Sequence, residues 1–233
     1  MFKIGARGEG VKELQRKLLK SGYKLEVDGV YGPVTNSIYN KFVLDSKNSN
    51  IDTLSSDILK FANSYVGQEE IKGNLGFKNP WFHKLMIGVG FQRTHPWCAY
   101  FTELCWKEGY KTNTKNDIEI QNILGKLFSA SVMQTRNNFI KNGKVYGFEL
   151  SKFPSPGALI IYQSATNKSF GHIGVVEKIF GEAIHTIEGN TDINGSREGF
   201  IVAKKIRRLD FTVRNKGLNL IGFINPVTIN IGK

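Results

Sequence analysis

Residues 172–190, HIGVVEKIFGEAIHTIEGN, predict a β-hairpin. Two β-rich segments, 172–179 and 184–190, flank turn residues at Phe180-Gly181-Glu182-Ala183. Further β-rich segments, separated by turn residues, lie at 158–162, 200–206 and 220–224. Helical patterns come before them, at residues 58–67, 97–108, 118–128 and 133–141. Because helices are followed by a run of adjacent strands, we predict the α+β class.

The predicted hairpin carries side chains suited to acid–base chemistry. Residues alternate faces along a strand, so Glu188 and Asn190 share a face. His172 joins them there if the connecting loop has three or five residues, whereas a loop of four places it on the other face. An acceptor oxygen beside the imidazole would hold its N–H and fix its tautomer. The small neighbours Gly171 and Gly174 would leave space for a substrate backbone.

Both cysteines of the chain, Cys98 and Cys105, lie in residues 95–109, HPWCAYFTELCWKEG. A helix would separate them by roughly 10 Å along its axis, whereas a disulfide needs Cα atoms within about 7 Å. A zinc site would need further ligands, and no suitable arrangement is formed by the histidines, His83, His95, His172 and His185. The cysteines are therefore two buried thiols, or one of them is a nucleophile.

Position favours Cys98 over Cys105 as the nucleophile. Cys98 lies in the predicted first turn of its helix, where partial positive charge lowers the pKa of a thiol. Cys105 lies two turns further inside and receives no such activation. A nucleophilic cysteine also needs a base, and the base needs an orienting group. His172, with Glu188 or Asn190 beside it, could supply both.

The chain of 233 residues is basic, with a formal net charge of +12 and a pI near 9.6. This surplus favours an anionic partner, such as nucleic acid, an anionic membrane surface or an acidic cell-wall polymer. The densest basic cluster, residues 204–208, lies near the end of a predicted strand, and we interpret it as a solvated strand edge. The first residues hold no apolar run of signal-peptide length, and no segment is long enough for a transmembrane helix.

Residues 5–43 predict a small unit of helix, tight turns and helix. The first helix has apolar residues at helical spacing and stops at Gly22. Turn signals follow at Asp28-Gly29 and Gly32-Pro33, and Thr35 is a candidate cap for the second helix. The unit is too short for a roomy enzyme and suits a binding module.

Two segments show no clear helix or strand pattern. Residues 46–57 are rich in Ser, Asn and Asp and predict a linker. Residues 68–94 are mixed and loop-like, and we assign to a core their aromatic side chains, Phe77, Trp81, Phe82 and Phe91.

A series of motifs from about residue 58 to residue 227 resembles the CHAP family of cysteine, histidine-dependent amidohydrolases/peptidases. The matching motifs are Trp97-Cys98-Ala99, Pro154-Ser155-Pro156-Gly157-Ala158, Gly171-His172-Ile173-Gly174-Val175-Val176, Ile187-Glu188-Gly189-Asn190 and Gly222-Phe223-Ile224-Asn225-Pro226. The resemblance implies a papain-like domain in which helices pack on an antiparallel sheet. It also implies roles for four residues: Cys98 as nucleophile, His172 as base, Glu188 as its orienter and Asn190 as an auxiliary polar group.

The chain departs from the family pattern in two places. Ala158 stands where the family often has Asp, outside the catalytic set. Some members carry an acidic calcium-binding loop before the cysteine, but residues 74–96 contain no Asp or Glu. We therefore expect neither a metal ion nor another cofactor.

Residues 5–43 are similar to the peptidoglycan-binding family of three-helix modules. The matching residues are Gly8-Glu9-Gly10-Val11, Leu14-Gln15, Leu18, Gly22-Tyr23, Asp28-Gly29-Val30-Tyr31-Gly32 and Thr35. The resemblance implies binding to the bacterial wall, with candidate substrate-binding residues Asp28, Gly29, Tyr31 and Gly32. Turn geometry alone also accounts for these residue types.

The domains predicted from these resemblances are a peptidoglycan-binding domain at 1–45, a linker at 46–57 and a CHAP domain at 58–233. Together they imply a peptidoglycan hydrolase, either an N-acetylmuramoyl-L-alanine amidase or an endopeptidase, that uses a cysteine thiolate and an acyl-enzyme. The combination resembles a phage endolysin, which is made in the host cytoplasm and acts at the wall after release to lyse the host. The expected partner is bacterial peptidoglycan, without nucleic acid or stable membrane insertion, and we expect a monomer.

Three alternatives remain at this stage. The enzyme could instead be an exported antibacterial effector or a host wall-remodelling amidase. The chain could be a non-catalytic wall-binding or phage structural protein that keeps the fold. Its charge alone suggests a nucleic-acid binder, but no recognised motif supports one.

Overall fold

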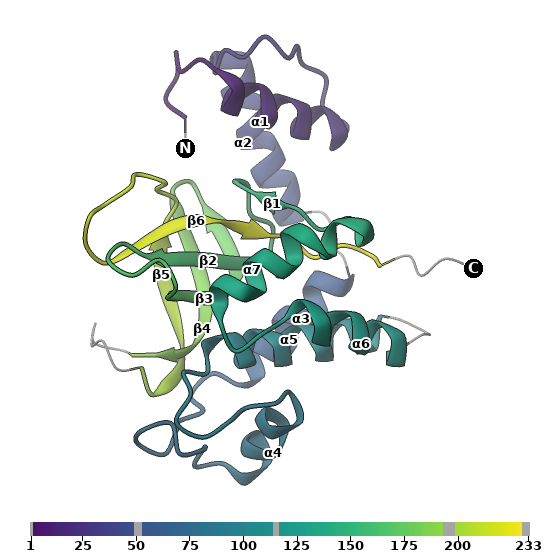
Figure 1. Cartoon of the computed structure of the whole chain (residues 1–233). Coiled ribbons are helices and arrows are strands. Elements are labelled where there is room, and N and C mark those ends of the chain that lie inside the picture. The colour runs from purple at the N-terminus through teal and green to yellow at the C-terminus, as the bar shows by residue number, and fades with distance from the viewer. Residues whose placement is uncertain (1, 49–52, 114–116, 193–198, 230–233) are drawn as a thin grey trace. The chain divides into compact units, whose positions relative to one another are not determined.

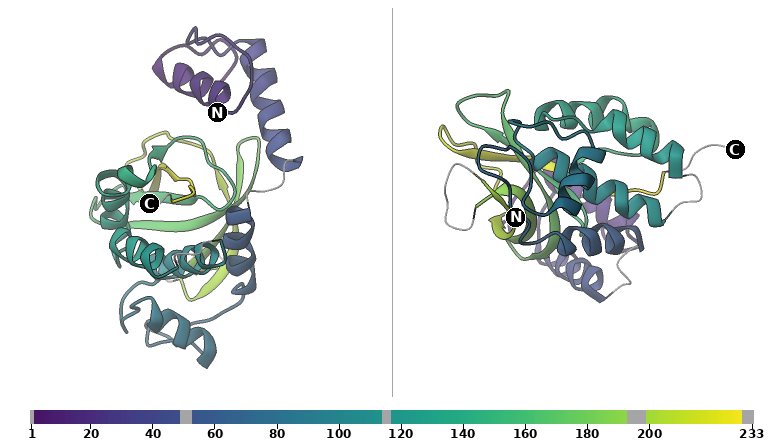
Figure 2. Two further views of the ribbon diagram at one scale, coloured as in Figure 1. Left: turned by 90° about the vertical axis from the view of Figure 1, so that its right-hand side faces the viewer. Right: turned by 90° about the horizontal axis from the view of Figure 1, so that it is seen from below.

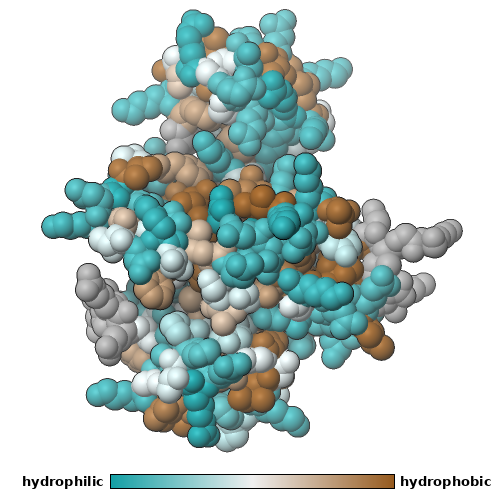
Figure 3. Space-filling model, in the orientation of Figure 1, coloured by the Kyte–Doolittle hydropathy of each residue, from teal (hydrophilic) through white to brown (hydrophobic). Residues whose placement is uncertain are grey.

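The computed structural model describes residues 2–48, 53–113, 117–192 and 199–229 (Figure 1). The chain divides into two compact units, Met1–Ile51 and Asp52–Lys233. Hydrophilic residues cover much of the face shown in Figure 3, in keeping with the many charged residues of the sequence. Among the described helices, none combines the length and the apolar character needed to span a bilayer.

The first unit contains helices α1 (Glu9–Lys20) and α2 (Pro33–Asn48). These are the helices among residues 2–48, where the resemblance implied three. The predicted apolar face of α1 is buried at Val11, Leu14 and Leu18. The expectation that Thr35 caps α2 was wrong, because the helix already begins at Pro33, a residue whose fixed φ suits a first helical position.

The segment predicted as a linker, residues 46–57, is helical at both ends. Helix α2 continues to Asn48, and α3 (Thr53–Ser64) begins well before the predicted start of its helix. The early start has a physical reason, since Leu54 is only 4% exposed and extends the apolar face of α3 towards the core. Residues 49–52 lie outside the described part of the chain.

The second unit is built on a six-stranded antiparallel sheet with the strand order β1-β6-β2-β3-β4-β5. Its strands are β1 (Leu150–Ser151), β2 (Leu159–Ser164), β3 (Gly171–Phe180), β4 (Ala183–Thr191), β5 (Ile201–Arg208) and β6 (Leu218–Ile224). The strands follow the helices along the chain, so the predicted α+β class is confirmed.

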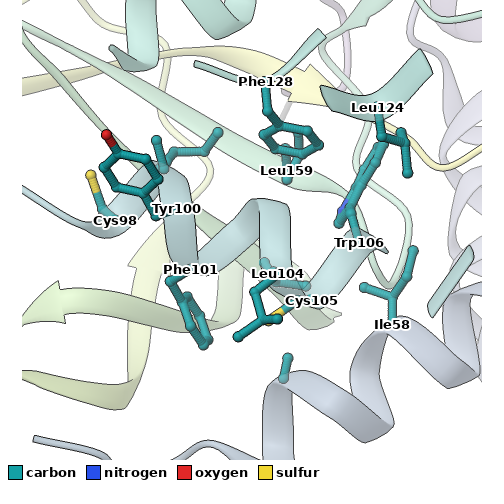
Figure 4. Close-up of a cluster of buried hydrophobic side chains, with 14 of the residues drawn as sticks. Ile58, Cys98, Tyr100, Phe101, Leu104, Cys105, Trp106, Leu124, Phe128 and Leu159 are labelled. Atoms are coloured by element: carbon teal, nitrogen blue, oxygen red, sulfur yellow. The ribbon is translucent and has the colours of Figure 1, made fainter. Parts of the chain in front are cut away.

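Helices cover one face of this sheet (Figures 1 and 2). The main core lies between that face and the helices α3, α5 (Cys98–Thr112), α6 (Asp117–Leu127) and α7 (Val132–Lys141). After α7, a short 3₁₀ helix, η1 (Gly143–Tyr146), leads to β1. Figure 4 shows part of this core, where Trp106 of α5 lies near Leu124 and Phe128. A second apolar cluster, including Ile160, Val176 and Phe223, uses side chains that alternate with those of the main core along the strands.

Among the described α-helices, one was not predicted. Helix α4 (Pro80–Gly88) lies within the segment expected to be loop-like. The Asn79 side chain caps it by accepting N–H bonds from Trp81 and Phe82, and Pro80 occupies its first turn. The assignment of aromatic residues to the core holds for Phe77, Phe82 and Phe91 but not for Trp81, which is 56% exposed.

The pairing in the β3–β4 hairpin determines the face of the sheet on which His172 lies. Phe180 pairs with Ala183, so the connecting turn is Gly181-Glu182, and a turn of this even length would place His172 on the face opposite Glu188. However, the register shifts by one residue between Val176 and Lys178, which is a β-bulge at Glu177. The bulge returns His172 to the same face as Glu188.

Candidate active site

Cys98 is the first residue of α5, and Cys105 lies two turns along the same helix. The preceding residue, Trp97, makes no side-chain hydrogen bond that caps the helix. In Figure 4, the sulfur of Cys98 points away from the apolar cluster, whereas Cys105 lies beside Leu104 within it. Cys98 is 5% exposed and Cys105 is fully buried, and burial raises the pKa of the Cys105 thiol well above its usual value. The structure therefore separates the two thiols as the sequence predicts.

Buried contacts fix the start of α5. The Trp97 indole N–H donates to Glu70 Oε2 at 2.7 Å. Strand β4 approaches the helix at Gly189, where an added Cβ would lie 2.7 Å from both Trp97 and Phe101. Only glycine permits an approach this close. The contact brings the end of β4, with Glu188, to the turn that carries Cys98.

His172 lies between a thiol and a carboxylate. Its Nε2 atom is 2.8 Å from Glu188 Oε2, and the Cys98 thiol is close enough to act on the pKa of its imidazole. Because Nε2 is engaged by Glu188, Nδ1 is the ring nitrogen left for the thiol. Burial lowers the pKa of His172, but the bonds to Cys98 and Glu188 outweigh this and raise it to about 10. The imidazolium form is therefore strongly favoured.

Glu188 is fully buried and its carboxylate is held from several sides. It accepts hydrogen bonds from Thr186 Oγ1 at 2.6 Å and from Arg207 Nε at 2.8 Å, and Arg207 Nη2 also donates to Oε2. Burial raises the pKa of the Glu188 carboxyl, but the hydrogen bonds from Arg207 and His172 outweigh burial and hold the pKa well below its usual range. Glu188 is thus a charged orienting group.

The glycines beside His172 make room for the protein's own atoms. A Cβ at Gly174 would lie 2.6 Å from Glu188 Cγ, and one at Gly171 would lie 2.4 Å from the Tyr162 carbonyl oxygen. The expectation that these glycines leave space for a substrate backbone was therefore wrong. They let the Glu188 side chain and strand β2 pack closely against β3.

Asn190 lies near the end of β4, where the pairing with β5 shifts register between Glu188 and Thr191, and it has a left-handed backbone at φ 52°. Among the described residues, a hydrogen bond joins His172 to Glu188, and none joins it to Asn190. The predicted auxiliary role of Asn190 stays a prediction.

Sequence reasoning missed Arg207. The cluster at residues 204–208 was interpreted as a solvated strand edge, which fits Lys204 and Arg208 because both are exposed. Arg207 instead reaches Glu188 and leaves only 29% of its side chain exposed. Alternation along a strand predicts that Arg207 lies on the opposite face of the sheet from the residues on either side of it. Its partner, however, depends on a cross-strand register that the sequence does not reveal.

The four candidate wall-binding residues lie in the loop before α2. Asp28 Oδ1 accepts from Gln15 Nε2 at 2.7 Å, and Gly29 N–H donates to Gln15 Oε1 at 2.8 Å with a left-handed φ of 73°. Tyr31 is only 1% exposed, and Gly32 N–H donates to the carbonyl of Val30. These contacts give the loop its shape, and the binding role of the four residues stays a prediction.

The contacts between Cys98, His172 and Glu188 fall within a segment that a known family describes. Residues 90–190 match the family model of the CHAP domain. The match supports a cysteine- and histidine-dependent amidohydrolase and suggests peptidoglycan amidase or endopeptidase activity. Neither the curated proteins nor the solved structures yielded a match to the chain.

The arrangement in the matched segment suits nucleophilic catalysis. A cysteine beside an imidazole that is itself held by a buried carboxylate has the neighbours that a nucleophilic cysteine requires. The first-turn N–H groups of a helix lack intrahelical acceptors, so those of α5 are available to an oxygen that gains negative charge near Cys98. The described residues hold no group of three or more His, Cys, Asp or Glu side chains suited to binding a metal ion.

Proposed function

We propose that the protein is a peptidoglycan hydrolase that cleaves an amide bond of the stem peptide or crosslink through the Cys98 thiolate. The observation that carries the proposal is the chain of contacts from Cys98 to His172 and on to Glu188. These residues lie in the segment that matches the CHAP domain. Helices packed on an antiparallel sheet, with the cysteine at a helix start, also support a papain-like arrangement.

The first half of the reaction forms an acyl-enzyme. The Cys98 sulfur attacks the amide carbon, a C–S bond forms, and the carbonyl oxygen becomes an oxyanion beside the N–H groups at the start of α5. When the intermediate collapses, the C–N bond breaks and the proton on His172 Nδ1 passes to the leaving amine. Glu188 keeps the imidazole in place through Nε2 during this transfer.

The second half releases the acyl group. His172, now neutral, takes a proton from water as the water oxygen bonds to the acyl carbon. The C–S bond then breaks, the acyl fragment leaves as a carboxylic acid, and the thiolate–imidazolium pair is restored. No oxidant or reductant takes part.

The first unit, in this proposal, binds the wall. Its resemblance to peptidoglycan-binding modules and the +12 net charge of the chain support an attraction to anionic wall polymers. Binding by a tethered module raises the local concentration of substrate for the CHAP domain. Asp28, Gly29, Tyr31 and Gly32 remain the candidate contacts in this unit.

We further propose that the biological task is host cell lysis by a bacteriophage endolysin, which reaches the wall after release from the cytoplasm. The pairing of a wall-binding unit with a wall-cleaving domain supports this role. Expression in a bacterial host with and without a pore-forming lysis protein tests it. Lysis that depends on both the pore and Cys98 is expected, and lysis without Cys98 contradicts it.

Purified peptidoglycan provides the direct test of hydrolysis. The wild-type protein should clear a peptidoglycan suspension, and Cys98→Ser should not, because the alcohol lacks a readily formed anion at neutral pH. Mass spectrometry of the released muropeptides then identifies the cleaved bond as the muramoyl–L-alanine amide or as a peptide bond. Equal clearing by both proteins would exclude the cysteine mechanism.

A further inference from the structure

Arg207 approaches the reacting groups from β5, an edge strand of the sheet. Its guanidinium donates to both oxygens of Glu188, from Nε to Oε1 at 2.8 Å and from Nη2 to Oε2. Such a bidentate contact fixes the orientation of a carboxylate and also neutralises its charge. The same Oε2 atom is the partner of His172 Nε2. Arg207 is therefore connected to the imidazole through the Glu188 carboxylate.

We propose that Arg207 is a positioning residue, whose guanidinium keeps Glu188 ionised and fixed so that Glu188 holds His172 against Cys98. The proposal rests on the proposed function, because it assigns Arg207 a part in the reaction of that site. Arg207 does not touch the substrate or the reacting atoms in this scheme. It acts through Glu188.

Burial makes this support necessary. Glu188 is fully buried, and a buried carboxylate without a cation takes up a proton. Protonation would remove the negative charge that stabilises the imidazolium. His172 cannot replace Arg207 in this task, because it becomes neutral once in each catalytic cycle when it gives its proton to the leaving amine. Arg207 keeps its charge throughout.

The surroundings of the pair contain few other charges. His172 on β3 and Arg207 on β5 are the charged groups that act on Glu188, with the uncharged Thr186 hydroxyl beside them. Tyr162 on β2 packs against the guanidinium, whose Cζ lies 5.7 Å from the ring centroid. Asp192, which follows β4, is the further acidic group that acts on Arg207, and it pairs with Lys205 at 3.3 Å.

The next residue of β5 offers a matched control. Arg208 projects to the opposite face of the strand and bonds to Glu182 at 3.0 Å. Its side chain is 71% exposed. Arg208→Ala therefore removes the same side chain from the adjacent position without touching Glu188.

Alkylation of Cys98 by iodoacetamide measures the state of the site without peptidoglycan, because the thiolate is the reacting form. Arg207→Ala should slow this alkylation by about tenfold or more near pH 6. The free energy of a hydrogen bond to a charged group corresponds to a factor of about that size. Arg208→Ala should react at the wild-type rate. A normal rate for a folded Arg207→Ala protein would overturn the proposal, as would equal slowing by Arg208→Ala.

Added cations give a test that a purely structural role would not pass. Arg207 lines a cavity of about 410 Å³ together with Tyr162, Arg208 and Asn219. Methylguanidinium can occupy the space that Arg207→Ala leaves, and it should restore part of the alkylation rate, while sodium chloride at the same ionic strength should not. Equal effects of the two salts would overturn the assignment.

A second substitution guards against loss of folding. Arg207→Lys keeps the charge but loses the bidentate contact, so we expect an alkylation rate between those of wild type and Arg207→Ala. In a Glu188→Gln background, Arg207→Lys should slow alkylation no further, because Arg207 acts through Glu188. A full additional loss there would refute the proposal. If this pattern holds but peptidoglycan is not cleaved, the proposed function fails and the role of Arg207 stands.

Discussion

The Nε2 atom of His172 and the Oε2 atom of Glu188 lie 2.8 Å apart, although the turn joining their strands would by itself place them on opposite faces of the sheet. The bulge at Glu177 adds one residue to β3 and reverses that outcome. The extra residue, Glu177, pairs with Lys204 across the sheet and leaves 17% of its side chain exposed. The contact between base and carboxylate therefore depends on a backbone irregularity several residues away.

The pH dependence of hydrolysis should report the contact between His172 and Glu188. His172 must be protonated to give a proton to the leaving amine, and its pKa is raised to about 10. Activity should therefore persist through neutral pH and fall only as the pH approaches about 10. In Glu188→Gln the imidazolium loses its anionic partner, so the alkaline fall should move several pH units lower, towards the ordinary histidine value of about 6.5.

Initial rates of peptidoglycan hydrolysis, measured between acidic and strongly alkaline pH, check this prediction. Retention of native far-UV circular dichroism shows that the variant is folded. If wild type and Glu188→Gln lose activity at the same alkaline pH, Glu188 does not set the ionisation of His172.

The two cysteines should differ in reactivity and in the effect of their removal. Iodoacetamide should label Cys98 and spare Cys105, because Cys105 is fully buried and burial raises the pKa of its thiol. Cys98→Ala should abolish hydrolysis, and Cys105→Ala should keep it with a small loss of thermal stability. Peptide mapping of the labelled protein and turbidity assays provide the two measurements. Loss of hydrolysis in Cys105→Ala alone would reverse the assignment.

Patterns along the sequence predict much of this site, and tertiary register accounts for what they miss. Helical spacing places Cys98 at a helix start, as the structure has it. Strand alternation puts Glu188 and Asn190 on one face, but a register shift between Glu188 and Thr191 interrupts that alternation, so the shared face stays a prediction. Alternation could not place His172, because the bulge at Glu177 has no clear sequence signal. The partner of Arg207 depends on the register between β4 and β5, which the sequence does not reveal either.

The beginning of α4 shows a different limit. Asn79-Pro80 is a recognisable helix start, but the short helix it opens carries the exposed Trp81 beside the buried Phe82 and lacks a clear apolar stripe. Local capping forms this helix, whereas the predicted helices were recognised from their periodicity. Similarly, the buried face of α3 extends into a polar segment that reads as a linker.

Gly189→Ala should damage the site without changing any reacting group. The added methyl group would lie 2.7 Å from Trp97 and Phe101, so β4 must move away from the start of α5. Overpacking of this kind costs about 1–3 kcal/mol of unfolding free energy. The displacement should also lower hydrolysis, because Glu188 precedes this residue. Denaturant unfolding and turbidity assays measure the two effects.

Gly88→Ala is the matched control for this change. Apart from the neighbouring residues and backbone of its own helix, no heavy atom lies within 4 Å of a Cβ built at Gly88, so the added methyl group meets open space. Both stability and hydrolysis should stay close to wild type. If the two alanine variants behave alike, the close approach at Gly189 has no part in forming the site.

Replacing Glu70 should loosen the turn that carries Cys98. Glu70→Leu removes the acceptor of the Trp97 indole N–H, which is fully buried and would lose its partner. Leaving such a donor unsatisfied costs about 1–3 kcal/mol of unfolding free energy. We expect hydrolysis to fall along with thermal stability, since Trp97 immediately precedes the nucleophile and its ring packs against β4.

Glu70→Gln separates hydrogen bonding from charge at this position. The amide oxygen of glutamine can accept the Trp97 N–H, so most of the stability and activity should be retained. Thermal unfolding and turbidity assays on both variants provide the comparison. If Glu70→Gln loses as much as Glu70→Leu, the carboxylate charge is what the site requires. If neither variant loses stability, the bond to Trp97 is not what fixes the start of α5, and the close packing at Gly189 must do so alone.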